Sequence, residues 1–170
     1  VDRFLNVYGL SLRNLGTPIY PRKYFLALLD QFPESTSITT ISKDHVDLTS
    51  VLSFYYKNRV MPYYGGGTPE ARQFNSYPYM YWKLMCDAVD RGYNEFDFGR
   101  SPIDSGPYAF KKNLGFKPRE MVYSFLPLDN HVIPDLTHND RNVQRLTTIW
   151  SKLPLALTNR LGPLGAIYAV

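Results

Sequence analysis

The chain has 170 residues, of which 44% are hydrophobic and 20% charged, as expected for one globular domain with its own core. The net charge of +4 favours anionic partners, but the basic residues look scattered, unlike the concentrated stripe of most nucleic-acid-binding proteins. One cysteine, Cys86, excludes a disulfide framework and a cysteine-based zinc site, and the three histidines lack metal-ligand spacing, so no metal site is expected. No stretch reaches the roughly 18 to 20 apolar residues of a membrane span, and we expect a cytoplasmic protein.

The N-terminal part of the chain predicts two short helices and then a strand. Gly16 and Pro18 end the first helix, and Pro21 begins the second. Residues 36–42 are rich in β-branched side chains and predict the first strand.

A hairpin is predicted next, from a long strand over residues 46–56 and a returning strand over 60–64. Pro62 lies inside the returning strand, where it has no N–H to donate to the ladder. This strand should therefore be splayed, bulged or at a sheet edge at that point. The glycines at 65–67 are expected to end the sheet as a flexible turn, with a phosphate-binding loop as the alternative.

The remaining elements alternate between helices and strands. Asn75 or Ser76 can cap a helix that Gly92 ends, and Ser105 can cap another that Gly115 ends. Strands are expected over 95–98 and 119–128, followed by a helix over about 140–153 and a tail interrupted by Pro and Gly.

This order predicts a mixed, mostly antiparallel sheet flanked by helices, an α/β or α+β domain, with one βαβ crossover through residues 76–92. We expect the domain to cover residues 1–134. Residues 135–170 would be a C-terminal helix and tail, either packed on the domain or leading out of it.

The segment from 95 to 116 carries the most suggestive charges. Asp97 lies in a strand expected to be buried, so its carboxylate needs a partner, and Arg100 or a helix N-terminus would serve. A structural ion pair and a catalytic or substrate-orienting role are equally compatible with this pattern. On the next helix Tyr108, Lys111 and Lys112 share one side, and the helix N-terminus favours an anion. The alternative is that the lysines are only solvated surface.

Two better-known motifs do not apply. "DFG" at residues 97–99 lacks every other part of a protein kinase, and the glycine triplet lacks the lysine and serine of a P-loop.

Five stretches in order together resemble the FemAB-related family, closest to its branch associated with exosortase and exopolysaccharide loci. They are "LGTPIYPRKYF" (15–25), "VLSFYYKNRVMPYYGGG" (51–67), "NSYPYMYWKLMCDAVDRG" (75–92), "FDFGRS" (96–101) and "YAFKKNLGF" (108–116). The resemblance covers most of residues 1–128.

The resemblance implies a GNAT-like acyltransferase fold, usually present as two tandem copies, of which this chain is similar to the second. It implies transfer of an acyl or aminoacyl group to an amine in peptidoglycan or exopolysaccharide synthesis, in the cytoplasm or peripheral to the inner membrane. The donor would be acyl-CoA or aminoacyl-tRNA, with no permanently bound cofactor. The implied partners are an anionic small molecule or a cell-wall or polysaccharide precursor, tRNA, and the N-terminal GNAT-like half of the same chain.

The resemblance also suggests site residues. Catalytic roles are expected for Lys111, similar to family lysines that meet phosphate or the oxyanion, and for Asp97 at the strand end. Substrate binding is expected for Tyr63, Tyr64, Gly65, Gly66, Gly67, Arg72, Asn75, Tyr81, Arg100, Ser101 and Tyr108.

One departure from acetyl-CoA-dependent relatives leaves alternatives open. Their pyrophosphate loop has an Arg/Gln-x-x-Gly-x-Gly/Ala frame, whereas "YYGGGTPEARQF" (63–74) has glycines without it. The chain could instead be a noncatalytic GNAT-like module that binds a nucleotide-sugar or polysaccharide precursor, or a tRNA-binding domain.

Overall fold

The computed structural model describes residues 1–124, 126 and 141–166. The N-terminal elements are α1 (Asp2–Leu15), α2 (Arg22–Gln31), β1 (Thr36–Lys43), β2 (Val46–Tyr56) and β3 (Arg59–Gly67). They are followed by the 3-10 helix η1 (Pro69–Arg72), α3 (Ser76–Asp90), β4 (Glu95–Phe96), α4 (Gly106–Asn113), α5 (Arg141–Lys152) and α6 (Leu155–Gly165).

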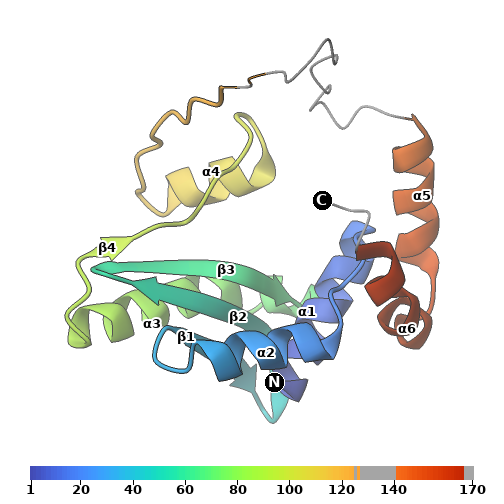
Figure 1. The fold of residues 1–170 in the computed structure, drawn as a ribbon, viewed down its shortest axis with the longest axis horizontal. Helices are drawn as coiled ribbons and strands as arrows, with labels where there is room; N and C mark the ends of the chain where they lie inside the picture. The colour runs from blue at the N-terminus through green and yellow to red at the C-terminus, as the bar shows by residue number, and fades with distance from the viewer. Residues whose placement is uncertain (125, 127–140, 167–170) are drawn as a thin grey trace. The chain divides into compact units, whose positions relative to one another are not determined.

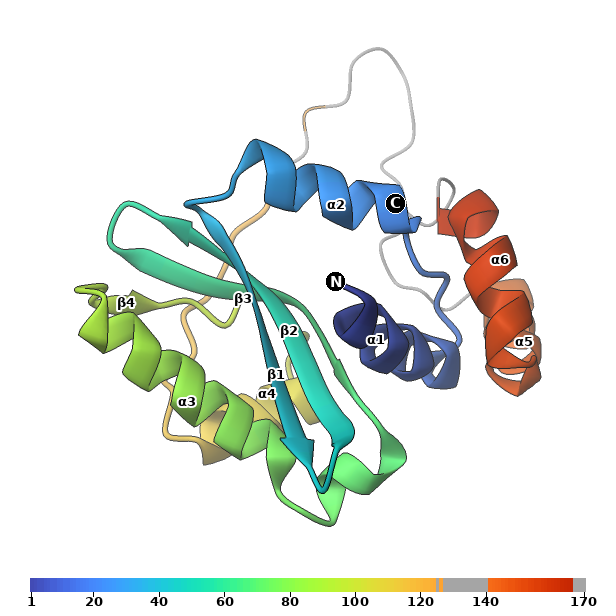
Figure 2. The same cartoon turned by 90° about the horizontal axis from the view of Figure 1, so that it is seen from below.

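The four strands form one sheet in the order β1-β2-β3-β4, with β1, β2 and β3 antiparallel and β4 parallel to β3. The predicted mixed sheet and its crossover through α3 are confirmed. Helix α3 covers one face of the sheet, and α1 and α2 cover the other (Figures 1 and 2).

Successive residues of β2 point alternately to the two faces of the sheet and so contribute to two hydrophobic cores, one on each face. Val51 and Tyr55 face α3, where they pack with Met80, Leu84 and Ala88. Leu52, between them, faces the other way and joins the cluster of α1 and α2 that holds Phe4, Tyr8, Ile19 and Phe25. The strand is therefore buried on both faces, including its small polar residues Thr49, Ser50 and Ser53.

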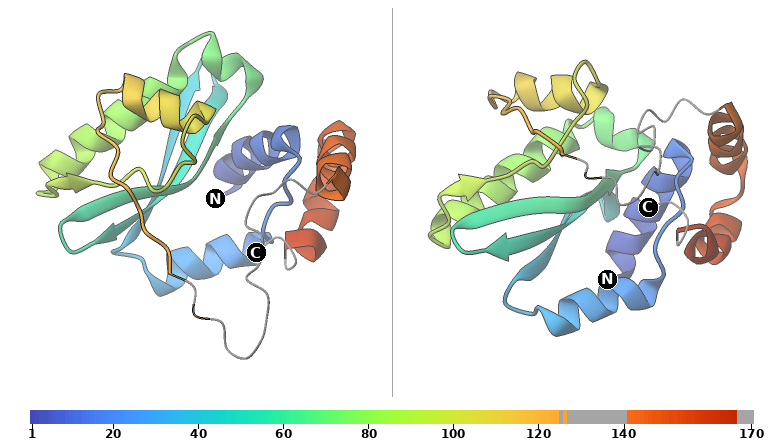
Figure 3. Two further views of the ribbon diagram at one scale, coloured as in Figure 1. Left: turned by 90° about the horizontal axis from the view of Figure 1, so that it is seen from above. Right: turned by 45° about the horizontal axis from the view of Figure 1, so that its top comes forward.

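The chain divides into two compact units, residues 1–99 with 147 onward, and residues 100–146. Within the first unit α6 lies against α1 (Figure 3). A Cβ atom on Gly162 of α6 would lie 3.0 Å from the backbone N and O of Ile19, so only a very small residue allows this approach. In the described part of the chain, no helix is both long and apolar enough to cross a bilayer.

Three predicted elements are wrong in part. The strand expected over 95–98 is only the two residues of β4. No strand forms over residues 119–124, where Met121, Val122 and Tyr123 are exposed, and residues 125, 127 and 128 of that prediction lie outside the described residues. The interrupted tail instead contains α6, with Pro163 inside the helix.

Candidate functional site

A β-bulge in β3 sets the geometry of the candidate site. Leu52 of β2 pairs with Tyr64 and Ser53 pairs with Pro62, which leaves Tyr63 as the extra residue. The sequence expectation of a distorted strand at Pro62 is thus confirmed. Among the described residues, β4 pairs with β3 only at Arg59 and Val60. Beyond Val60, the outer edge of β3 has no strand partner in the described part of the chain.

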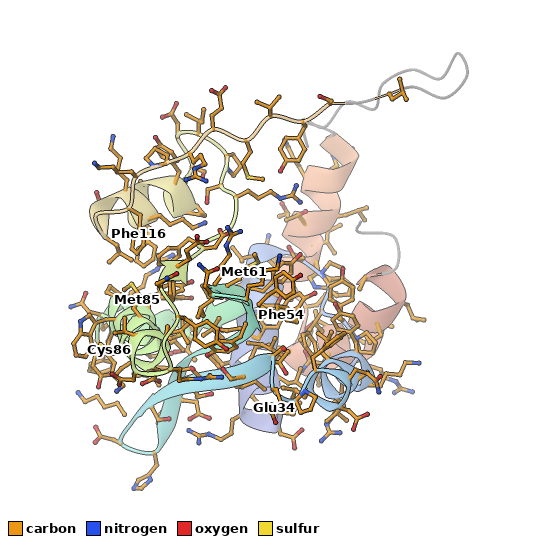
Figure 4. All side chains as sticks on the ribbon, turned by 60° about the vertical axis from the view of Figure 1, so that its left-hand side comes forward. Glu34, Phe54, Met61, Met85, Cys86 and Phe116 are labelled. Carbon is orange, nitrogen blue, oxygen red and sulfur yellow. The ribbon has the colours of Figure 1, made fainter. Side chains whose placement is uncertain are left out.

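The bulge gathers aromatic side chains on the face of α1 and α2. The Tyr63 ring lies 5.6 Å from that of Phe54, and the Tyr64 ring lies 5.4 Å from that of Phe25. Simple alternation would send adjacent residues to opposite faces, but the extra residue of the bulge lets both face α1 and α2. Phe54 stands beside its β3 partner Met61 in Figure 4.

One tyrosine of α2 and one from the loop before it complete what we call the tyrosine array, defined as Tyr20, Tyr24, Tyr63 and Tyr64. The hydroxyls of Tyr24 and Tyr64 are hydrogen-bonded at 2.7 Å. The Tyr20 ring lies 4.8 Å from that of Tyr24 and 6.3 Å from that of Tyr64. Burial, and then the hydrogen bond with Tyr24, raise the pKa of Tyr64, so its phenol stays protonated at neutral pH. The array therefore offers aromatic faces and phenol hydroxyls beside the open edge of β3.

The array includes two residues that the sequence argument missed. Tyr20 and Tyr24 lie within the quoted "LGTPIYPRKYF", and their spacing of four places them on one side of the chain as it enters α2. That spacing was the available signal, but only the fold shows that the two rings meet β3.

The glycine triplet is part of β3 rather than a flexible turn. Gly65, Gly66 and Gly67 pair with Val51, Ser50 and Thr49 of β2. A Cβ atom on Gly66 would lie 2.5 Å from Cβ of Ser11, and one on Gly67 would lie 2.8 Å from the hydroxyl oxygen of Tyr77. The triplet thus lets α1 and α3 approach the strand closely, and its assignment to substrate binding stays a prediction.

Asp97 is neither deeply buried nor paired with Arg100. Its side chain is 35% exposed, and its carboxylate meets Nη1 of Arg59 at 3.3 Å. The Gly99 N–H donates to the same carboxylate at 2.8 Å, and Arg59 also binds Glu95 at 2.9 Å. The expected partner was wrong because β4 pairs with β3 at Arg59, which brings that residue beside Glu95 and the following Asp97. This contact favours the structural ion pair, although a catalytic role stays a prediction.

Three further predicted site residues follow β3 in the first unit. Arg72 ends η1 and Asn75 precedes α3, and both are exposed. Tyr81 instead packs under the sheet against the α3 cluster, with its ring 4.8 Å from that of Phe98. Burial raises the pKa of Tyr81 to about 12. The sheet therefore separates Tyr81 from Tyr63 and Tyr64, and the structure does not bring these three residues together.

The second unit contains the predicted basic cluster. The Lys111 ammonium donates to Oγ of Ser101 at 2.8 Å and to the Arg100 carbonyl at 3.4 Å. The Arg100 guanidinium donates to the hydroxyl of Tyr123 at 3.2 Å. Arg100, Ser101 and Lys111 are therefore brought together. Lys111 is half-buried rather than fully exposed as solvated surface would be.

Helix α4 starts as its sequence predicts. The Ser105 side chain accepts from the Tyr108 N–H at 3.3 Å and donates to the Pro102 carbonyl at 2.6 Å. This cap fixes the first turn, and Tyr108 and Lys111, three residues apart, are neighbours on the helix surface. Lys112 is exposed beside them.

The described residues contain one thiol and no cluster of side chains suited to a metal ion. In the described residues no three or more His, Cys, Asp or Glu side chains are placed to hold a metal ion. Cys86 is a free, half-buried thiol on α3 next to Met85 (Figure 4).

A bulged central strand that separates from a parallel neighbour, with helices on both faces, is the architecture of an N-acetyltransferase-type domain. A family model described as an acetyltransferase (GNAT) domain matches residues 1–112. The chain therefore belongs to the GNAT acetyltransferase-domain family. No protein of curated function matches the chain in sequence.

Solved structures share this fold. The chain is similar to AAC(6')-Iy in complex with the bisubstrate analogue CoA-S-monomethyl-acetylneamine, with a TM-score of 0.54, 17% identity, and 65% of this chain and 83% of that chain covered. It is also similar to the aminoglycoside 6'-N-acetyltransferase AAC(6')-IG from Acinetobacter haemolyticus, with a TM-score of 0.50, 15% identity, and 64% and 82% covered. At these identities the likeness establishes the fold alone.

Proposed function

We propose that this domain transfers an acyl group from an acyl-CoA to an amine of a cell-envelope or exopolysaccharide precursor. The observation that carries the proposal is the bulged, open edge of β3 beside the tyrosine array, in a chain of the GNAT family. In this reaction the amine nitrogen attacks the thioester carbonyl carbon, the carbon–sulfur bond breaks, the nitrogen loses a proton and the thiolate gains one. Such catalysis depends mainly on positioning and charge stabilisation.

The open strand edge supports the acyl site. Backbone N–H groups of β3 that have no strand partner can donate to a carbonyl oxygen as it becomes an oxyanion. The tyrosine array supports the acceptor site, because aromatic faces and phenol hydroxyls bind both an ammonium group and a sugar ring. Neither role needs a charged side chain in the array.

The basic cluster supports an anionic donor. We assign Lys111 and Arg100 to the phosphates of the donor, with Ser101 and Tyr108 beside them. Acyl-CoA is preferred over aminoacyl-tRNA because the similar AAC(6')-Iy structure contains a CoA-linked bisubstrate analogue. The proposal includes membership of the FemAB-related branch and a second GNAT-like half in the same chain. It also includes a cytoplasmic location peripheral to the inner membrane. The GNAT-like domain would cover residues 1–134.

The test measures release of free CoA from acetyl-CoA with a panel of amino sugars and peptidyl amines. We expect release that depends on the amine, and Lys111→Ala to raise the KM for acetyl-CoA roughly tenfold, the effect of losing one charged hydrogen bond. Lys112→Ala, an exposed neighbour on the same helix, is the matched control.

Three results would contradict the proposal in different ways. Equal effects of the two lysine variants would remove Lys111 from the donor site. Thermal stabilisation by aminoacyl-tRNA but not by acetyl-CoA would make aminoacyl-tRNA the donor in place of acyl-CoA. Stabilisation by nucleotide-sugars without any transfer would favour a noncatalytic binding module, which the absent pyrophosphate-loop frame in residues 63–74 keeps as the second candidate.

A further inference from the structure

The described C-terminal segment carries an exposed apolar strip on α6. Leu157, Leu161 and Leu164 follow one another at spacings of four and three, so they share one side of the helix. They are 40%, 39% and 66% exposed. This is a large amount of leucine surface for a helix that already buries another side.

That other side fixes the orientation of α6. Thr158, Gly162 and Ala166 are buried, and Gly162 is in contact with Ile19. These residues follow one another at spacings of four, on a different side of the helix from the leucines. The leucine strip is therefore not the surface by which α6 joins the first unit.

Helix α5 adds an apolar residue and a cation. Ile149 is 59% exposed, and Lys152 lies three residues further along, beside it on the helix surface. On α6, Arg160 stands three residues after Leu157 and borders the strip. These residues lie on the exposed sides of two successive helices, and we call them together the C-terminal basic-apolar surface: Ile149, Lys152, Leu157, Arg160, Leu161 and Leu164.

The C-terminal segment is basic and lacks acidic side chains. Residues 141–166 contain four basic residues and no acidic residue, whereas residues 1–140 contain fifteen of each. The net charge of +4 therefore comes entirely from this part of the sequence. Over residues 1–140 the acidic and basic residues balance in sum, although the segment around Arg100 and Lys111 is locally basic.

We propose that the C-terminal basic-apolar surface docks peripherally on an anionic lipid bilayer. An apolar helix face bordered by Lys and Arg inserts at the headgroup boundary, and each cation adds attraction to anionic headgroups. A second copy of the chain fits less well, because two such surfaces would bring positive charges together with no acid in the segment to pair with them. The inference does not depend on the proposed acyl transfer.

The test is co-sedimentation of the full chain with vesicles. We expect binding to phosphatidylcholine vesicles that contain phosphatidylglycerol, weakened by high salt, and little binding to phosphatidylcholine alone. Lys152→Gln/Arg160→Gln should weaken partitioning on the order of 25-fold, about fivefold for each charge. Lys23→Gln/Lys57→Gln removes the same charge elsewhere and should have little effect.

A second pair of variants isolates the apolar contribution. Leu161→Ser should weaken binding roughly tenfold. Leu26→Ser changes a leucine of matching exposure, 38% against 39%, on α2, and should leave binding unchanged. Circular dichroism establishes that the variants are folded.

The proposal is overturned by an absence of vesicle binding, by equal binding to neutral and anionic vesicles, or by equal losses in the two leucine variants. Concentration-dependent dimerisation that Leu161→Ser abolishes, without vesicle binding, would instead assign the surface to self-association. These outcomes bear on the peripheral location included in the proposed function but not on CoA release, so failure of membrane docking and failure of acyl transfer are distinguished.

Discussion

Tyr81 shows how the position of a single side chain changes its chemistry. It points from α3 into the core cluster under the sheet, whereas Tyr79, two residues earlier, is exposed on the outer side of the same helix. Burial removes water from the Tyr81 phenol and disfavours its ionised form, which raises its pKa from 10 to about 12. The hydroxyl is therefore better explained as part of the core than as a binding group.

The raised pKa of Tyr81 makes the free energy of unfolding depend on pH in the alkaline range. Because the folded pKa of Tyr81 lies above the unfolded one, its contribution is complete below about pH 10 and is lost as the pH rises from about 10 to about 12. In urea unfolding between pH 9 and pH 11.5, Tyr81→Phe should lose less stability than the wild type, by roughly 1 to 2 kcal/mol. Tyr79→Phe is the control. Identical pH dependence in all three proteins would contradict the buried position of Tyr81.

Arg59 illustrates a second residue-scale effect, the joining of two strands by charge. It binds Glu95 and Asp97 on the parallel neighbour, and all three side chains are at least 35% exposed. Surface ion pairs of this kind contribute about 0 to 1 kcal/mol to the free energy of unfolding, so this pairing adds little to stability. The ion pair favours a modest structural role for Asp97, and its expected catalytic role stays a prediction.

At the scale of elements, the end of β3 provides the sharpest test. Gly66 lies in a regular strand, and an added Cβ atom would meet the Ser11 side chain of α1 at 2.5 Å. Gly66→Ala should therefore destabilise the protein by roughly 1 to 3 kcal/mol through overpacking. At Gly106, in the first turn of α4, nothing lies within 4 Å of an added Cβ atom, so Gly106→Ala should be nearly neutral. Urea midpoints that shifted equally would mean that the triplet is a flexible turn after all.

Elements were predictable where local signals and tertiary packing agree. Gly16, Pro21 and Ser105 mark helix ends in the sequence, and the structure places helix ends at all three. The distortion at Pro62 followed from its missing N–H. The predictions failed where packing decides: Gly162 and Pro163 look like helix breakers, but Gly162 is the residue that lets α6 approach Ile19.

The candidate site was only partly predictable for the same reason. Tyr63 and Tyr64 were found from the strand argument and the family resemblance, but their companions Tyr20 and Tyr24 come from a helix and the loop before it. Arg59 was missed as the partner of Asp97 because the two residues are 38 positions apart and meet only through strand pairing. Sequence spacing reports neighbours within an element, and the sheet decides the rest.

At the scale of the whole molecule, the boundary of the domain can be tested directly. The sequence predicts a domain over residues 1–134, with the remainder either packed on it or leading out. Within the first unit α6 buries Thr158, Gly162 and Ala166, and the Arg13 guanidinium donates to the Ser151 carbonyl at 3.1 Å. These contacts indicate that removing the C-terminal helices would expose part of the α1 core, including Ile19.

A chain that ends at residue 134 should therefore keep its sheet but lose roughly 2 to 5 kcal/mol of stability, the cost of a large core truncation. Gly162→Val should reproduce part of this loss in the full chain, because its side chain would collide with the Ile19 backbone at 3.0 Å. Ala156→Val, at an exposed position of the same helix, controls for the poorer helix propensity of valine. Urea unfolding followed by circular dichroism measures all three. If the truncated chain and Gly162→Val both unfold at the wild-type midpoint, residues 135–170 lead out of the domain, and its stability is complete without them.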